Sequence, residues 1–220
     1  MRNYKKLALS FAIISTMIFS VSCGTKEEQK ADSTTEIVTE AEKSDTGATG
    51  QVDNAENVDY NQILSQLEET KEPSLSNFKT VDIDGNIVDQ TLWSGKKVTM
   101  LNIWGTFCGP CIGEMPDLNA INEEYTDKDF QIVGLVIDTS AGDGNIIPSQ
   151  VELAKDIIKQ TGVEYKNILP SNDLNTTILN QVTSLPTTVF LDEKGNMISD
   201  YYLGSKSKTD WKKVIQQYLP

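Results

Sequence analysis

The chain has 220 residues, three cysteines and no histidine, and 32 acidic against 19 basic side chains give it a formal charge of −13 at neutral pH. Without histidine there is no Ser-His-Asp triad, no Cys-His protease pair, no His-ligated zinc and no haem with a proximal histidine. The acidic balance argues against nucleic acid as a partner, because phosphates need a basic surface. The composition leaves catalysis by cysteine or carboxylate.

The N-terminus is typical of an exported protein. Three basic residues precede an uncharged, mostly apolar stretch at residues 7–21. The stretch is shorter than the about 20 apolar residues of a membrane-spanning helix, so it predicts a secretory signal peptide over residues 1–22. Small residues flank Cys23, as in a bacterial lipobox, although Ser20 stands where that motif usually has an aliphatic residue. We expect Cys23 to be lipidated; the alternative is an ordinary cleaved signal with an incidental cysteine.

Residues 23–77 are predicted to form an acidic tether. The segment is rich in Glu, Asp, Thr and Ser and poor in aromatic residues. Such a composition cannot bury enough apolar surface to offset the entropy of ordering, so we expect it to be largely disordered. One exception is the apolar pattern of Val58, Ile63, Leu64 and Leu67, which predicts a short helix packed on the following domain.

The domain is expected over residues 78–220, where strand and helix patterns alternate. The strand patterns are a hairpin at 78–88 around an Asp-Gly-Asn turn, buried runs at 98–104 and 130–138, and strands at 187–192 and 197–202. The helical patterns are 110–125 with an interruption at Pro116, 150–160, 174–179 and 208–218. Strand–helix–strand alternation followed by a terminal hairpin and helix predicts an α/β domain with a mixed sheet.

A pair of cysteines stands where the strand pattern at 98–104 gives way to the helix pattern at 110–125. Cys108 would meet the free N–H groups and the positive end of the helix dipole, both of which favour a thiolate. Cys111 lies one turn further on, close enough to resolve a mixed disulfide on Cys108 and leave a Cys108–Cys111 disulfide. The spacing predicts a redox-active dithiol.

Other uses of these two cysteines fit less well. A structural disulfide remains possible in an exported protein, but the two-residue spacing at a strand–helix junction favours redox turnover. A zinc site would need two more Cys or His ligands, and a c-type haem attachment would need His in place of Ile112. A peroxidase pattern fails at Gly105 and Leu101. We therefore expect no metal and no cofactor.

Several motifs around the dithiol carry a resemblance to a known family. They are Leu101-Asn102-Ile103-Trp104-Gly105-Thr106, Glu114-Met115-Pro116, Leu185-Pro186-Thr187-Thr188 and Glu193-Lys194-Gly195. With these motifs in order, residues 78–220 resemble the thioredoxin superfamily, and within it the TlpA/ResA-like thiol-disulfide oxidoreductases. The resemblance implies a thioredoxin fold, a mixed central sheet flanked by helices, with an N-terminal β-hairpin and a central insertion.

The resemblance also implies further site residues. The Leu185–Pro186 bond would be cis and face the cysteines, and the backbone of Leu185 would pair with an extended substrate segment. Glu114 would share a helix face with both cysteines and tune or deprotonate them, the alternative being a solvated glutamate. Asn102 stands where cytoplasmic thioredoxins have a buried Asp, which leaves Glu114 as the best-placed base.

Two aromatic residues, Trp104 and Phe107, flank the dithiol. Each is predicted either to contact substrate or simply to pack the end of the strand. The family usually has Trp immediately before the first cysteine, and Phe107 departs from that pattern.

The predicted function is that of a lipid-anchored, extracytoplasmic bacterial disulfide reductase. The resemblance implies that a membrane thiol carrier of the CcdA type supplies electrons and that protein disulfides, such as those of apocytochrome c or redox-repair enzymes, receive them. A Cys-Gly-Pro-Cys motif lies at the reducing end of the superfamily. The alternatives are a disulfide-forming oxidase and a redox-sensing binding module without turnover. A membrane anchor and a charged tether favour a monomer.

Overall fold

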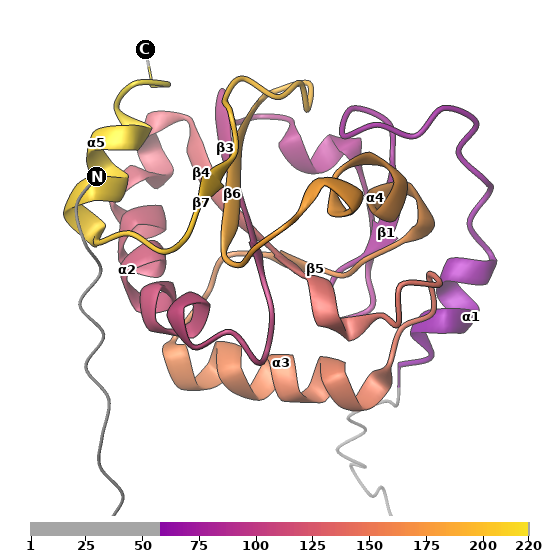
Figure 1. Ribbon diagram of the computed structural model, residues 1–220. Helices are drawn as coiled ribbons and strands as arrows, with labels where there is room; N and C mark the ends of the chain where they lie inside the picture. Colours follow the sequence, from indigo (N-terminus) through magenta and orange to yellow (C-terminus); the bar gives the residue numbers. More distant parts are fainter. Residues whose placement is uncertain (1–57, 220) are drawn as a thin grey trace, which may run out of the picture. The chain divides into compact units, whose positions relative to one another are not determined.

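The computed structural model describes residues 58–219. The predicted signal peptide, Cys23 and the first part of the tether lie outside the described residues. At the centre is a five-stranded mixed sheet in the order β5-β4-β3-β6-β7 (Figure 1). Its strands are β3 (Val98–Trp104), β4 (Phe130–Val136), β5 (Asn167–Ile168), β6 (Thr187–Asp192) and β7 (Tyr202–Leu203). β3, β4 and β5 are parallel, whereas β6 and β7 pair antiparallel. The predicted mixed α/β sheet is confirmed.

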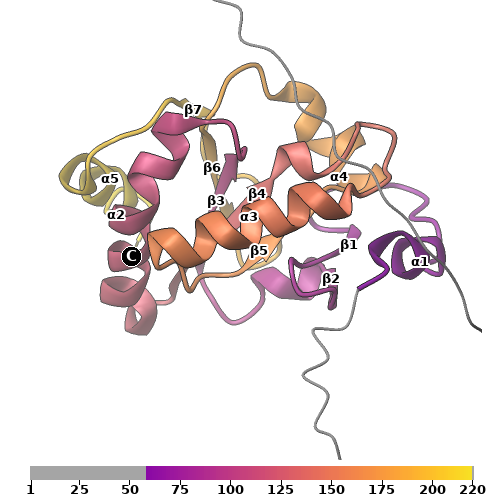
Figure 2. The ribbon, with the colours of Figure 1, turned by 90° about the horizontal axis from the view of Figure 1, so that it is seen from below.

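Helices cover both faces of this sheet. They are α1 (Tyr60–Ser65), α2 (Gly109–Tyr125), α3 (Pro148–Thr161), α4 (Asn172–Thr177) and α5 (Lys208–Ile215), with single 3₁₀ turns at Gln90–Trp93, Thr126–Lys128, Ile137–Thr139 and Leu179–Gln181. Apolar side chains of α2, α3 and α5 belong to one core cluster and those of α4 to the other. The N-terminal hairpin contributes Val81 to the first cluster and Val88 to the second. Figures 1 and 2 show how these helices are arranged around the sheet. Alternate side chains of β3 enter opposite cores because successive strand residues point to opposite faces.

The predicted hairpin is confirmed as β1 (Lys79–Val81) and β2 (Ile87–Asp89). Gly85 occupies the turn with φ +86°, a conformation that favours glycine. The carboxylate of Asp82 accepts hydrogen bonds from the backbone N–H groups of Asp84 and Asn86 at 3.0 and 2.9 Å. A bridge between Asp82 and Ile168 joins the hairpin to β5, so the hairpin packs as part of the domain.

The packed structure begins before Phe78, where we expected the tether to end. The short helix expected near residues 58–67 is present as α1. Its Tyr60 is buried and donates a hydrogen bond to the carbonyl of Ile83 at 2.7 Å. The Asn61 side chain exchanges two hydrogen bonds with the backbone of Ile146, at 3.0 and 2.7 Å. These hydrogen bonds hold the segment against the domain. The polar composition of the segment gave no indication of them.

The helix predicted over residues 110–125 is present as α2, which continues through Pro116; a proline inside a helix removes one backbone donor and leaves the others in place. One further element differs from expectation. The strand expected at 197–202 is reduced to a bridge between Leu191 and Met197 and to the short β7. The hydroxyl of Ser199 accepts the Phe190 N–H at 2.8 Å, in place of a backbone carbonyl, and so interrupts the ladder.

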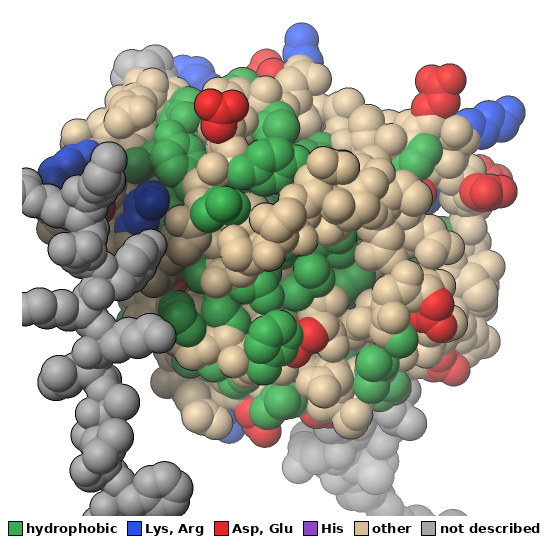
Figure 3. Space-filling view, in the orientation of Figure 1, with side chains coloured by type: hydrophobic (Ala, Val, Ile, Leu, Met, Phe, Trp, Pro, Cys, Tyr) green, Lys and Arg blue, Asp and Glu red, His purple; other side chains and the backbone are tan. Residues whose placement is uncertain are grey.

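The surface of β7 and of the segment before it carries exposed apolar side chains. Its large exposed apolar side chains are Met197, Ile198, Tyr201 and Leu203. Figure 3 shows apolar side chains gathered on the face that carries β6 and β7 in Figure 1, with few charged side chains among them.

Candidate active site

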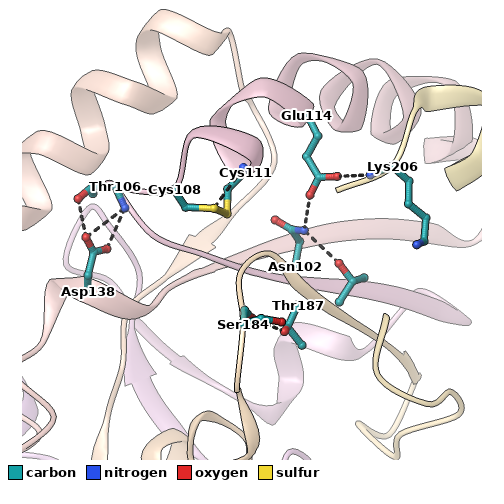
Figure 4. Close-up of a disulfide and its surroundings, with 10 residues drawn as sticks. Asn102, Thr106, Cys108, Cys111, Glu114, Asp138, Ser184, Thr187 and Lys206 are labelled. Carbon is teal, nitrogen blue, oxygen red and sulfur yellow. Dashed lines mark hydrogen bonds between the residues drawn. A yellow bond between two sulfur atoms is a disulfide. The ribbon is translucent and has the colours of Figure 1, made fainter. Parts of the chain in front are cut away.

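The dithiol lies at the junction of β3 and α2, and it is present as a Cys108–Cys111 disulfide (Figure 4). Cys108 is the N-cap of α2, and its Sγ accepts the backbone N–H of Cys111 at 3.3 Å. Pro110 lies in the first turn, where its missing N–H removes no helical hydrogen bond. The side chain of Cys108 is 6 % exposed and that of Cys111 is 1 % exposed. Cys108 is therefore the sulfur that a substrate reaches first.

A cis peptide bond precedes Pro186, as the resemblance implied. A side chain at Gly105 would place its Cβ 3.2 Å from Leu185 Cδ1, so this loop lies close against the end of β3. Pro186 accepts the backbone N–H of Gly204 at 2.9 Å. Within residues 58–219, the backbone N–H and C=O of Leu185 have no hydrogen-bond partner. They are free to pair with an extended segment.

A pocket of about 540 Å³ opens beside Cys108. Phe107, Ile137, Val182 and Leu185 give it apolar walls. Phe107 is 75 % exposed, which is costly for an aromatic ring unless something else covers it. This placement fits the predicted substrate contact of Phe107.

Trp104 lies elsewhere. Its side chain has no exposed surface, and its indole N–H donates at 2.9 Å to Oδ1 of Asn167 on β5, over Gly134 of the intervening strand β4. A side chain that is enclosed in this way cannot meet a substrate in the pocket. The structure thus favours packing, the other role considered for Trp104, over substrate contact.

Glu114 lies one turn beyond Cys111 on α2, and it is not a solvated glutamate. Its side chain is 4 % exposed. Its Oε1 accepts a hydrogen bond from Asn102 Nδ2 at 3.2 Å. Its Oε2 accepts one from the Lys206 backbone N–H at 3.1 Å and one from the Trp211 indole at 2.9 Å (Figure 4 shows all of these but the Trp211 bond). Side chains and backbone from three elements fix the carboxyl in place.

Burial sets the acidity of Glu114. Removal from water raises the pKa of its carboxyl above the ordinary value, and the hydrogen bonds from Trp211, Lys206 and Asn102 offset this only in part. The carboxyl also lines a second cavity of about 370 Å³, together with Asp117 and Lys206. This cavity gives a proton on Glu114 a route to solvent.

Asn102 occupies the centre of β3 and supports this carboxyl. Its side-chain nitrogen donates to Glu114 and also to the hydroxyl of Thr188, at 3.1 Å, on the neighbouring strand β6. An amide cannot take up a proton from the dithiol in the neutral pH range. Glu114 is thus the buried titratable side chain that flanks Cys111 on α2.

Asp138, Lys206 and Trp211 were missed from the sequence. Asp138 lies in the 3₁₀ turn after β4. Its two carboxylate oxygens accept the backbone N–H of Thr106 at 3.0 and 3.1 Å as well as the Thr106 hydroxyl (Figure 4). The signal for Asp138 was present, because the carboxyl ends of adjacent parallel strands meet at one edge of a sheet. Nothing local marked Lys206 or Trp211, the latter 97 residues from Glu114.

No cluster of three or more Cys, Asp or Glu side chains within residues 58–219 has a geometry that could hold a metal ion. No helix in the same span is both long and apolar enough to cross a membrane.

Comparison with known proteins identifies the class. The Redoxin family profile matches residues 68–215. The chain belongs to the Redoxin family. It is 29 % identical over 147 residues to the thiol-disulfide oxidoreductase ResA of Bacillus cereus, covering 66 % of this chain and 76 % of the relative. It is 35 % identical over 121 residues to the thioredoxin-like protein YneN of Bacillus subtilis, covering 55 % of this chain and 64 % of the relative.

Solved structures give the fold of this Redoxin-family chain. A thiol:disulfide interchange protein of the thioredoxin family from Chlorobium tepidum aligns with a TM-score of 0.54 and 23 % identity, covering 70 % of this chain and 99 % of that one. A putative DsbE from the same organism aligns with a TM-score of 0.52 and 21 % identity, covering 70 % and 100 %. The predicted thioredoxin fold and ResA-like membership are confirmed, and the protein is a protein disulfide oxidoreductase.

Proposed function

We propose that this protein is a membrane-anchored enzyme that reduces disulfide bonds in extracytoplasmic proteins. The observation that carries the catalytic part of this proposal is the pairing of a slightly exposed cysteine with a fully sheltered one beside a buried carboxyl. Cys108 is reachable at the N-terminus of α2, Cys111 is enclosed, and Glu114 follows Cys111 on the same helix face. These three groups supply a nucleophile, a resolving thiol and a proton acceptor.

The reaction starts from the reduced dithiol. The Cys108 thiolate attacks one sulfur of a client disulfide, the client S–S bond breaks, and the other client sulfur leaves as a thiolate that takes a proton. Glu114 accepts the proton of the Cys111 thiol. The Cys111 thiolate then attacks Cys108 Sγ, which releases the second client thiolate and forms the Cys108–Cys111 disulfide. Two electrons pass to the client, and the disulfide seen in the structure is the product.

The client is held beside the dithiol as an extended segment. The unpaired backbone N–H and C=O of Leu185 offer it strand-like hydrogen bonds, next to cis Pro186. The ring of Phe107 would cover the client chain in the pocket that Phe107 and Leu185 both line beside Cys108. Backbone pairing of this kind accepts many sequences, which suits an enzyme that reduces several proteins.

The cellular setting comes from the N-terminal sequence and the family resemblance. The signal-like residues 1–22, Cys23 and the acidic segment after it support a lipid anchor on the outer face of the cytoplasmic membrane. A membrane thiol carrier of the CcdA type would reduce the Cys108–Cys111 disulfide again. Apocytochrome c and redox-repair enzymes are the proposed clients.

A trapping experiment tests the proposal. Cys111→Ala leaves Cys108 free to attack but removes resolution, so mixed disulfides with client proteins should accumulate in the expressing cells. Cys108→Ala is the matched control and should trap none. Equal yields from the two variants would show that the dithiol does not turn over as proposed. A redox potential of the pair well above that of thioredoxin-like reductants would instead indicate a disulfide-forming oxidase.

A further inference from the structure

The pocket beside Cys108 combines apolar walls with a single charged side chain. Phe107, Val182 and Leu185 contribute apolar surface, and Asp138 is the one charged residue of the described chain that lines it. Cys108 opens into the same pocket. A client segment whose cysteine reacts there must therefore place a neighbouring side chain close to the carboxylate of Asp138.

The carboxylate of Asp138 is held firmly in this position. Both oxygens accept hydrogen bonds from Thr106, two residues before Cys108 on the chain (Figure 4). The Thr106 hydroxyl lies in addition 3.3 Å from Oε1 of Gln150 on α3. These hydrogen bonds fix the Asp138 carboxylate to the loop that leads into Cys108.

Among residues 58–219 this carboxylate has no cationic partner. The ion pairs found among residues 58–219 involve other acids, and no Lys or Arg of that span reaches Asp138. A carboxylate offers about four acceptor positions, and the Thr106 contacts occupy three. Asp138 is half-buried, so its charge is less screened than one on the open surface.

We propose that Asp138 makes the site selective for client segments that carry a lysine or arginine next to the reacting cysteine. This inference rests on the proposed function, because it concerns the first attack by Cys108. A basic side chain would pair with the free lone pairs of Asp138, and its aliphatic stem would lie along the ring of Phe107. An acidic side chain at the same place would be repelled.

Three disulfide peptides test this selectivity. They are identical except for one residue beside the cysteine, which is Lys, Gln or Glu, and the rate of attack by the reduced protein is measured for each. We expect the Lys peptide to react about 5- to 10-fold faster than the Glu peptide at low salt, with the Gln peptide between them. High salt should narrow the difference.

Asp138→Asn removes the charge but keeps an acceptor for the Thr106 N–H and a donor for its hydroxyl. In this variant the ratio of the Lys-peptide rate to the Glu-peptide rate should fall to about one, whatever the absolute rates are. Asp143→Asn is the matched control, because Asp143 is an exposed acid in the loop that follows, with its carboxylate bonded to Asn145. The control should keep the full preference.

Three results would overturn the inference and leave the proposed function standing. They are equal rates for all peptides with the unaltered protein, an unchanged preference in Asp138→Asn, and an equal loss of preference in Asp143→Asn, which would point to the overall acidity of the domain. A protein that attacks none of the peptides would overturn the proposed function itself, and the selectivity with it.

Discussion

Replacement of Glu114 by Gln provides the sharpest test of the proton-transfer step. The two side chains have the same shape, but the amide cannot accept a proton from Cys111. Three donors converge on the carboxyl, two of them on Oε2. A Gln oxygen at the Oε2 position keeps the bonds from Lys206 and Trp211. The Gln side-chain nitrogen then faces Asn102. The Asn102 amide can rotate so that its oxygen accepts one hydrogen bond from this nitrogen and one from the Thr188 hydroxyl.

The expected change in stability is small, because two effects oppose each other. The variant loses charge-assisted hydrogen bonds, each with a net contribution of about 1.5–3 kcal/mol, but it no longer buries an ionised group. We expect a net change within about 2 kcal/mol at neutral pH. Since the pKa of Glu114 is raised in the fold, its contribution to stability is fully present below the ordinary pKa of glutamate. That contribution is lost as pH rises through the raised value, and Glu114→Gln should abolish this dependence.

The effect on catalysis should be much larger. A positioned general base contributes about 10²- to 10⁴-fold, and water in the adjacent cavity can replace part of that, so we expect resolution by Cys111 to slow by about 100-fold. In the unaltered protein this step should also slow as pH falls through the raised pKa of Glu114, because protonation removes the base. In Glu114→Gln, the rate of resolution should not fall in this way as the pH is lowered.

Stopped-flow measurement with a client peptide that carries a dye on each half of its disulfide separates the two steps. Release of the first half reports attack by Cys108, and release of the second reports resolution by Cys111. The first phase should change little and the second should show the loss. Glu123→Gln, an exposed acid further along α2, is the control and should leave both phases unchanged. A second phase with the same rate and pH profile in Glu114→Gln and Glu123→Gln would refute the role of Glu114.

Two further substitutions probe the charges around the fold. Burial opposes ionisation of Asp82, but Lys166 at 2.6 Å and hydrogen bonds from the turn outweigh it and hold the pKa of Asp82 below its ordinary value. Asp82→Asn should therefore lower the free energy of unfolding by about 1–2 kcal/mol at neutral pH. The difference in stability between the two proteins should vanish as pH falls through the lowered pKa of Asp82. Urea unfolding at neutral and at acid pH measures both effects. Trp211→Phe removes a donor that lowers the pKa of Glu114, so the acidic limb of the resolution rate should move to higher pH. An unmoved limb would contradict the pKa argument.

Much of the site could be predicted because its signals are local. The dithiol spacing, the buried runs that became β3 and β4, and the shared helix face of Cys111 and Glu114 all follow from periodicity over a few residues. The cis bond at Pro186 came from the family resemblance, since a strand-entry proline gives no such indication by itself.

The structure changed the assignment of the two aromatic residues near the dithiol. Trp104 and Phe107 are three positions apart, yet one is enclosed in the core and the other is among the most exposed apolar side chains described. Both are large aromatic residues close to the dithiol, so the sequence gives no reason to separate them. Their different exposure comes from the elements that pack around each one. Trp104, the last residue of β3, points into the core beside Asn167. Phe107, in the loop that follows, lines the pocket beside Cys108.

The sequence by itself determined the chemistry of this protein, two cysteines and a carboxylate without histidine, and the order of its strands and helices. Only the tertiary structure decided how that chemistry is tuned. The partners of Glu114 come from β3, from the loop before α5 and from α5 itself, and Asp138 reaches Thr106 across neighbouring strands. Local patterns record which face of an element is apolar. They do not record which polar groups meet when distant faces pack, because that depends on the relative placement of whole elements.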